Sequence, residues 1–155
     1  MLTVLTRPWL IGLLTVGAVL ITIQLVPVER TNPAVEGDIG APPPVESILK
    51  RACYDCHSNL TRWRWYSHVA PFSWLMVHDV KLARMEVNFS RWSSYYPQTR
   101  RRKLEWIGRE LANQAMPPWQ YRLVHPEARL SSHARVMLRQ WIQSSLTAAD
   151  APNIN

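Results

Sequence analysis

The pattern of hydrophobic and polar positions begins with an apolar stretch, Trp9 to Val26, that contains no charged residue. As an α-helix, these 18 residues would extend about 27 Å, close to the roughly 30 Å hydrocarbon core of a bilayer. A cleaved signal peptide would have a shorter apolar core, of about 7–15 residues, followed by a small-residue cleavage site. Residues 1–26 are therefore predicted to be a cytoplasmic stub and an uncleaved transmembrane anchor, with Arg7 on the cytoplasmic side.

Residues 27–44 are rich in proline and are predicted to form a linker. This segment contains five prolines and two glycines, which disfavour regular helix or strand. A stiff, extended spacer between the anchor and a folded domain is the expected result.

Helical periodicity starts at Val45, and it continues with Ile48, Leu49, Ala52 and Cys53 on one apolar face. The same spacing returns over residues 134–142, for which Ser131 is a suitable N-cap. Further helices are predicted over residues 74–86 and 97–114, and no stretch alternates with a period of two. The sequence therefore predicts an all-α domain over residues 45–147, followed by a disordered tail over residues 148–155.

Four short helices in a domain of roughly 110 residues bury limited apolar surface and would be only marginally stable. The only two cysteines are three residues apart, so no disulfide is expected to staple the fold. A large buried cofactor would complete such a core.

The two cysteines belong to the sequence Cys53-Tyr54-Asp55-Cys56-His57, which has the C-x-x-C-H pattern of c-type haem attachment. Positions i, i+3 and i+4 lie on one side of a helical turn. Two thiols placed this way can add to the vinyl groups of one haem while the imidazole binds the iron. This spacing followed by His would arise by chance about once in two thousand such chains. The motif predicts one covalent haem c, with His57 as the proximal iron ligand.

Two other uses of a cysteine pair fit the sequence less well. A thioredoxin-like dithiol would need a βαβ context, and a structural zinc site would need a second pair of ligands. The sequence offers neither.

Met116 is the predicted distal iron ligand. Pro117 disfavours helical geometry at the residue before it, so Met116 should lie on a rigid turn after a helix. The alternatives are His68 and His78, either of which would give bis-His ligation.

Aromatic and basic residues close to the motif are candidates for contacts with the cofactor. Trp63, Trp65 and Tyr66 are predicted to line the haem pocket, and Arg62 and Arg64 are candidates for pairing with haem propionates.

The chain is basic, with a net charge of +7, of which the part after residue 26 carries +6. In the cytosol such a chain would suggest nucleic acid. Outside the membrane we expect no nucleic acid, and an acidic docking surface on a redox protein partner becomes the better match. The run Arg100-Arg101-Arg102-Lys103 is a candidate docking patch, because these cations at a helix start have no evident stabilising role.

The sequence also resembles the small membrane-anchored haem-binding domain family of bacteria, whose members join an N-terminal anchor and a Pro-rich linker to a C-x-x-C-H domain. The resemblance covers nearly the whole chain. The matching stretches are residues 29–33, 51–59, 69–71, 88–90, 116–118 and 125–131. It implies periplasmic haem binding at Cys53, Cys56 and His57. The layout is also similar to class I cytochromes c, in which the first and last helices pack together.

These inferences predict a cytochrome c-like all-α domain around one covalent haem, behind a single transmembrane helix. The chain is expected to be an electron carrier and not an enzyme, single-pass in the bacterial inner membrane, with its C-terminal domain in the periplasm. The alternative is a haem-based sensor or a peroxidase-like site with an open distal position.

Overall fold

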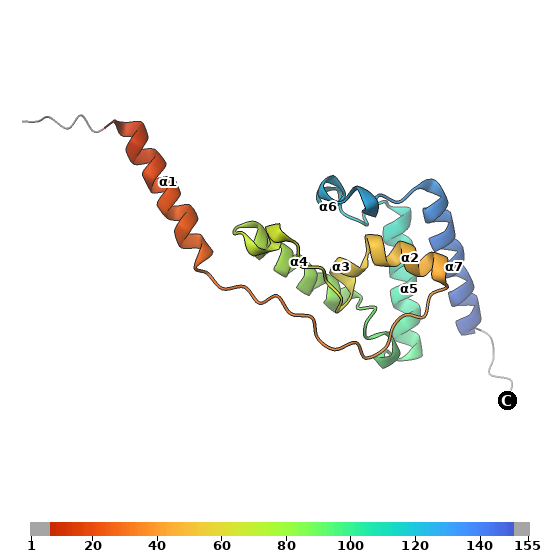
Figure 1. Cartoon of the computed structure of the whole chain (residues 1–155). Helices are drawn as coiled ribbons and strands as arrows, with labels where there is room; N and C mark the ends of the chain where they lie inside the picture. Colours follow the sequence, from red (N-terminus) through yellow and green to blue (C-terminus); the bar gives the residue numbers. More distant parts are fainter. Residues whose placement is uncertain (1–6, 151–155) are drawn as a thin grey trace, which may run out of the picture. The chain divides into compact units, whose positions relative to one another are not determined.

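The computed structural model describes residues 7–150, and within this range it is built from helices without a β-strand (Figure 1). The α-helices are α1 (Pro8–Gln24), α2 (Pro43–Ala52), α3 (Tyr54–His57), α4 (Phe72–Glu86), α5 (Pro97–Ala112), α6 (Trp119–Val124) and α7 (Ser132–Asp150). Short 3-10 helices form at Trp65–His68, Trp92–Ser94 and Pro126–Ala128. The prediction of an all-α protein is confirmed.

The chain forms two compact units. The first contains the described residues up to Arg30 together with Trp63–Asp79, and the second contains Thr31–Arg62 and the chain from Val80 onward. Helix α4 begins in the first unit and ends in the second.

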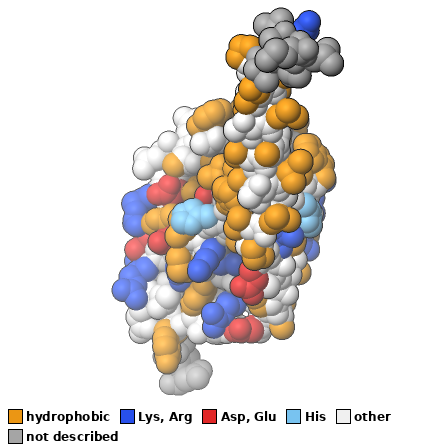
Figure 2. Space-filling view, turned by 90° about the vertical axis from the view of Figure 1, so that its left-hand side faces the viewer, with side chains coloured by type: hydrophobic (Ala, Val, Ile, Leu, Met, Phe, Trp, Pro, Cys, Tyr) orange, Lys and Arg blue, Asp and Glu red, His pale blue; other side chains and the backbone are white. Residues whose placement is uncertain are grey.

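In the first unit, α1 consists almost entirely of apolar residues, and none of its side chains is buried. Figure 2 shows hydrophobic side chains along this helix. The helix has 17 residues, and Leu25 and Val26 lie beyond its end, which makes it shorter than the predicted span. Among the described residues, no helix is long and apolar enough to span a bilayer, so the predicted transmembrane helix is not supported.

The end of α1 is fixed to another part of the first unit. The Gln24 side chain donates to the carbonyl oxygen of Ala70 (3.2 Å) and accepts a hydrogen bond from the Ala70 amide (2.9 Å). Arg30 donates to the carbonyl oxygen of Ser67 (3.4 Å). These bonds join segments more than 35 residues apart in the sequence.

In the second unit, α2, α5 and α7 enclose the core, and α7 contacts both α2 and α5 (Figure 1). The α2 side chains with the predicted periodicity, Val45, Ile48 and Leu49, are all buried. They face α7, which contributes the buried Leu138 and Ile142. Contact between the first helix of the domain and the last is therefore confirmed.

Helix α7 starts where its N-cap was predicted, because the Ser131 hydroxyl accepts a hydrogen bond from the Ala134 amide (3.1 Å). The helix continues to Asp150, so the first three residues of the predicted tail are helical. Residues 151–155 of that tail lie outside the described residues.

The C-terminal part of the proline-rich segment packs along the second unit. The amides of Glu36 and Gly37 donate to the carbonyl oxygen of Ser90 (2.9 and 3.2 Å), and the Trp92 amide donates to the carbonyl oxygen of Gly37 (3.0 Å). Ile39 is part of the core. This part of the segment is therefore fixed to the domain by backbone hydrogen bonds and by burial.

Candidate functional site

The two cysteines and the histidine of the motif lie on one helical turn. Helix α2 ends at Ala52, Cys53 caps it, and α3 contains Cys56 and His57. The amides of Cys56 and His57 both donate to the carbonyl oxygen of Cys53 (3.2 and 2.9 Å). The turn therefore has the geometry that the i, i+3, i+4 spacing predicts.

His57 is buried and held by the end of α4. Its Nδ1 lies 3.1 Å from the carbonyl oxygens of both Ala83 and Val87. Carbonyl oxygens only accept, so Nδ1 must carry the proton, and Nε2 keeps the lone pair that a metal requires. Burial lowers the pKa of His57 below its ordinary value, despite these two hydrogen bonds. The ring is thus neutral and fixed in the tautomer of a metal ligand.

Cys53 and His57 line a pocket together with Met116. The open volume of the pocket is about 30 Å³, so the side chains around it nearly close it in this structure. The remaining walls are apolar except for Glu110. They are formed by Leu49, Val87, Phe89, Trp106, Ile107, Leu111 and Leu138. A thiol, an imidazole and a thioether in one apolar pocket suit a haem, which needs thiols for attachment and nitrogen or sulfur ligands for iron.

Met116 lies outside the helices, as predicted. Helix α5 ends at Ala112, and Gln114 has a positive φ of 56°. The Ala115 amide donates to the carbonyl oxygen of Glu110 (3.1 Å) and closes the helix end. The chain then passes Met116 and starts α6 at Trp119. Placement of Met116 in the pocket agrees with a ligand role, and coordination of iron stays a prediction.

Among the pocket residues that were not identified as site residues from the sequence are Trp106, Phe89 and Glu110. The Trp106 ring lies edge-on to the His57 ring, with 6.2 Å between centroids, and the Phe89 ring lies 6.1 Å away. Both restrict the imidazole orientation. Phe89 belongs to a stretch that matches the resembled family, which was the one available signal. Trp106 and Glu110 have no local signal.

The two residues between the cysteines are buried and hydrogen-bonded. The Tyr54 hydroxyl donates to the Asp38 carboxylate. Asp55 accepts from Arg62 Nε and Nη2 (both 3.0 Å), from the Arg62 amide (3.1 Å) and from the Tyr121 hydroxyl (2.7 Å). Burial alone would raise the pKa of Asp55, but the hydrogen bonds from Arg62 and Tyr121 hold it below its usual range. Arg62 therefore has a partner within the protein, and its pairing with a haem propionate stays a prediction.

Arg84 joins the motif to the proline-rich segment. Its guanidinium donates to the carbonyl oxygens of Ser58 (2.8 Å) and Thr31 (2.9 Å). It also donates to the side chains of Asn32 (3.0 Å) and Thr61 (2.9 Å). Four hydrogen bonds from one side chain therefore fix the chain on both sides of the motif.

The other predicted pocket residues belong to the first unit. Trp65 is 78% exposed, and its ring lies edge-on to Tyr66 at 5.8 Å. Trp63 and the alternative ligands His68 and His78 are in the same unit, whereas the motif is in the second. The roles of these five residues in a haem site stay predictions.

The basic run at the start of α5 has intramolecular partners. Arg100 donates to the carbonyl oxygens of Tyr95 (2.9 Å) and Ser93 (2.8 Å). Lys103 donates to the carbonyl oxygen of Glu86 and lies 4.7 Å from the centre of the Tyr95 ring. These two cations tie α5 to the end of α4 and to the loop that follows it, so the view that the run has no stabilising role was wrong.

The environment of the cysteines differs from that of a reactive dithiol. Burial, with a smaller contribution from Cys56, raises the pKa of the Cys53 thiol to about 12, whereas redox-active cysteines have lowered pKa values. Within residues 7–150, no group of three His, Cys, Asp or Glu side chains could hold a metal ion. A haem needs no such group, because the porphyrin supplies four iron ligands.

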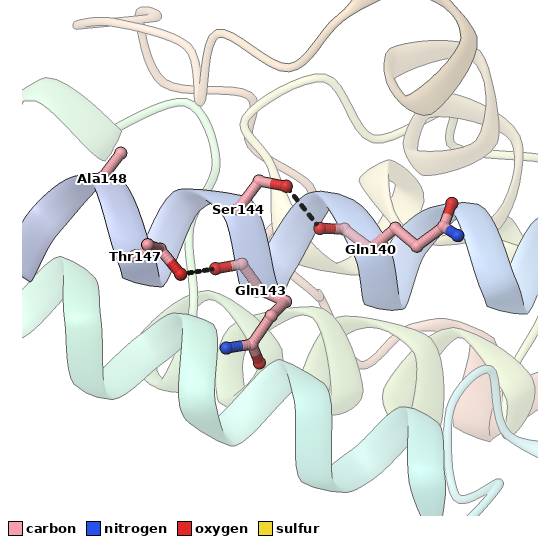
Figure 3. Close-up of a pocket in the computed structure, with 5 residues that line it drawn as sticks. All are labelled: Gln140, Gln143, Ser144, Thr147 and Ala148. Atoms are coloured by element: carbon pink, nitrogen blue, oxygen red, sulfur yellow. Dashed lines mark hydrogen bonds between the residues drawn. The ribbon is translucent and has the colours of Figure 1, made fainter.

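A second hollow lies along α7 and is lined by Gln140, Gln143, Ser144, Thr147 and Ala148 (Figure 3). The Ser144 and Thr147 hydroxyls donate to the carbonyl oxygens of Gln140 (2.9 Å) and Gln143 (3.0 Å) in their own helix. The lining comes from one helix and contains no ionisable side chain. The pocket at the motif is therefore the better candidate for chemistry.

Comparison with known proteins gives one match. A family model described as a haem-binding domain matches residues 18–144, a range that includes the motif, the pocket residues and Met116. No curated protein and no solved structure matches the chain at a significant level.

Proposed function

Because the chain belongs to the family of haem-binding domains, we propose that it is a monohaem c-type cytochrome that carries single electrons. Cys53 and Cys56 form the thioether bonds to the haem, and His57 is the proximal iron ligand. Met116 is the distal ligand.

One observation carries this proposal: Met116, which is distant in the sequence from the attachment motif, lines the same apolar pocket as Cys53 and His57. The two carbonyl oxygens at His57 Nδ1 fix the imidazole so that Nε2 is the nitrogen available to iron. A bound haem supplies an iron that changes between two oxidation states, and the protein decides which ligands and which solvent reach it.

The role as a carrier follows from the ligand set and the packing around it. With His57 and Met116 both bound, no coordination position is left for a substrate, and the apolar walls exclude water. Residues of α2, α5 and α7 line the pocket beside both ligands, and two hydrogen bonds hold the His57 ring, so little rearrangement should accompany a change in charge. Thioether ligation also favours the reduced state.

We further propose that the protein works outside the cytoplasm, attached to a bacterial inner membrane, with a redox protein as partner. Haem attachment through thioethers, which bacteria carry out after export, supports this location. Apolar, exposed side chains along α1 support membrane attachment. The net charge of +6 after residue 26 favours an acidic docking surface on the partner. Recovery of the protein from the soluble fraction of disrupted cells, without detergent, would contradict attachment.

The first experiment tests covalent attachment. The full chain is expressed in a bacterium with its cytochrome c maturation machinery, and the purified protein is denatured and weighed by mass spectrometry. We expect the mass of one haem to remain on the chain and to disappear in the double variant Cys53→Ser, Cys56→Ser. A colourless wild-type chain with two free thiols would refute the proposal.

The second experiment tests the distal ligand. We expect a low-spin ferric spectrum with a thioether-to-iron charge-transfer band, which Met116→Ala removes while lowering the reduction potential. Met85→Ala, at a 62% exposed position on α4, is the control. It should leave the charge-transfer band and the reduction potential unchanged. High-spin ferric iron in the wild type would instead indicate an open distal position, as in a sensor or a peroxidase.

A further inference from the structure

A partly buried hydrogen bond links the haem attachment turn to the segment that follows Met116. Tyr121 Oη donates to Asp55 Oδ2 at 2.7 Å. Asp55 lies between the two attachment cysteines, and Tyr121 is in α6, five residues after Met116. The bond therefore connects the parts of the chain that would supply the ligands on opposite faces of the haem.

The Asp55 carboxylate is a fixed anchor for this bond. Asp55 is 5% exposed, and Arg62 donates hydrogen bonds to both of its carboxylate oxygens, from Nε and from Nη2. The carboxylate is half of a salt bridge, because the Arg62 guanidinium donates to its two oxygens at 3.0 Å. A hydrogen bond to a charged, immobilised acceptor is about twice as strong as one between neutral groups.

Tyr121 is held on its other side as well. Its ring stacks on the His125 ring, with centroids 4.1 Å apart and planes at 23°. His125 is buried, and its Nδ1 lies 3.1 Å from Glu127 Oε1. Only four residues separate Met116 from Tyr121, and two of them are Pro117 and Pro118, whose φ angles are fixed. Restraint of Tyr121 is therefore transmitted to Met116 through a stiff connection.

We propose that Tyr121 and Asp55 are positioning residues for the distal ligand: their hydrogen bond holds the Met116 loop against the attachment turn and keeps the Met116 sulfur on the iron. This inference rests on the proposed function, since it requires a bound haem with Met116 as ligand. Neither residue contacts the iron; both act through Met116.

Competition with imidazole for the ferric iron tests this role in the full, haem-loaded chain. Imidazole binds only when the Met116 sulfur leaves, so its apparent affinity measures how firmly the loop is held. Tyr121→Phe removes one hydroxyl and keeps the ring that stacks on His125. We expect imidazole to bind about tenfold more tightly, the factor that the loss of one hydrogen bond to a charged group implies. The charge-transfer band should persist without imidazole.

Tyr95→Phe is the matched control. It also removes one tyrosine hydroxyl from a hydrogen bond in the second unit, here one that the hydroxyl accepts from the Asn88 amide (3.1 Å), and Tyr95 does not line the pocket. It should leave the imidazole affinity unchanged. Asp55→Asn keeps a hydrogen-bond acceptor but removes the charge. Like Tyr121→Phe, it should raise the affinity for imidazole.

Two results would overturn the inference. One is an imidazole affinity that stays at the wild-type value in both Tyr121→Phe and Asp55→Asn. The other is an imidazole affinity that rises by the same factor in Tyr121→Phe and in Tyr95→Phe. Failure of the proposed function gives a different result. In that case wild type and Met116→Ala bind imidazole equally well, because Met116 was never on the iron.

Discussion

Replacement of Arg84 by Met should destabilise the domain more than the loss of an ordinary surface charge. The variant keeps a long apolar stem and removes the guanidinium that donates to Ser58, Thr31, Asn32 and Thr61 at 2.8 to 3.0 Å. A hydrogen bond contributes about 1 kcal/mol net, and more when one partner is charged, so four buried bonds of this kind would contribute about 4 kcal/mol or more. The bonds to Thr31 and Asn32 are solvent-exposed, and we expect a loss of about 2–3 kcal/mol.

Urea unfolding of the haem-loaded chain, followed by far-ultraviolet circular dichroism, measures this loss. A mild non-ionic detergent should be present throughout, because α1 exposes its apolar side chains. Hydrogen exchange gives a local readout: the amides of Glu36 and Gly37, which donate to Ser90, should exchange faster once Arg84 no longer holds the segment.

Arg91→Met is the control, because Arg91 also joins the proline-rich segment to the domain. Its partner is Glu36 at 3.2 Å, and both side chains are about half exposed, so its removal should cost less than about 1 kcal/mol. Equal losses in the two variants, or a loss below about 1 kcal/mol for Arg84→Met, would show that the four bonds do not act as described.

Three further substitutions test the core, a close backbone approach and a helix cap, each measured by the same unfolding assay. Leu49→Ala should lower the unfolding free energy by about 3 kcal/mol, because Leu49 is 1% exposed and leaves a cavity beside the pocket; a loss below about 1 kcal/mol would contradict its burial. Gly37→Ala should cost about 1–3 kcal/mol, since an added Cβ would lie 2.1 Å from Ser93 Oγ; restoration by the second substitution Ser93→Gly would verify the clash. Ser131→Ala should cost about 1 kcal/mol by removing the acceptor for the Ala134 amide, and Ser131→Asp should retain most of the stability.

Local patterns in the sequence were sufficient to predict the main helices of the domain. The apolar spacing from Val45 to Cys53 corresponds to α2, and Ser131 caps α7 as predicted. Pro117 correctly indicated that Met116 lies outside a helix. These features depend on neighbours within a few positions, which a sequence shows directly.

Features that depend on tertiary contacts were not predictable in this way. The carbonyl groups of Ala83 and Val87 are held near His57 by packing of the α4 end, and nothing in their side chains marks them. Trp106 lines the pocket because α5 packs on α7 at a particular rotation. The sequence analysis considered only a haem propionate as the partner of Arg62. Asp55 is seven residues away, and nothing in the sequence shows that the two side chains meet.

On the proposed function, burial of the residues around the two cysteines bears on the order of events in biosynthesis. Tyr54 and Asp55 are 3% and 5% exposed, and His57 is 8% exposed, so most of the turn faces the interior once the domain has closed. An enzyme that joins both sulfurs to a porphyrin must reach the two half-buried cysteines and the buried His57 together, which an open chain permits. On the proposed function, haem attachment precedes closure of the helices, and a chain that folds first does not receive a haem.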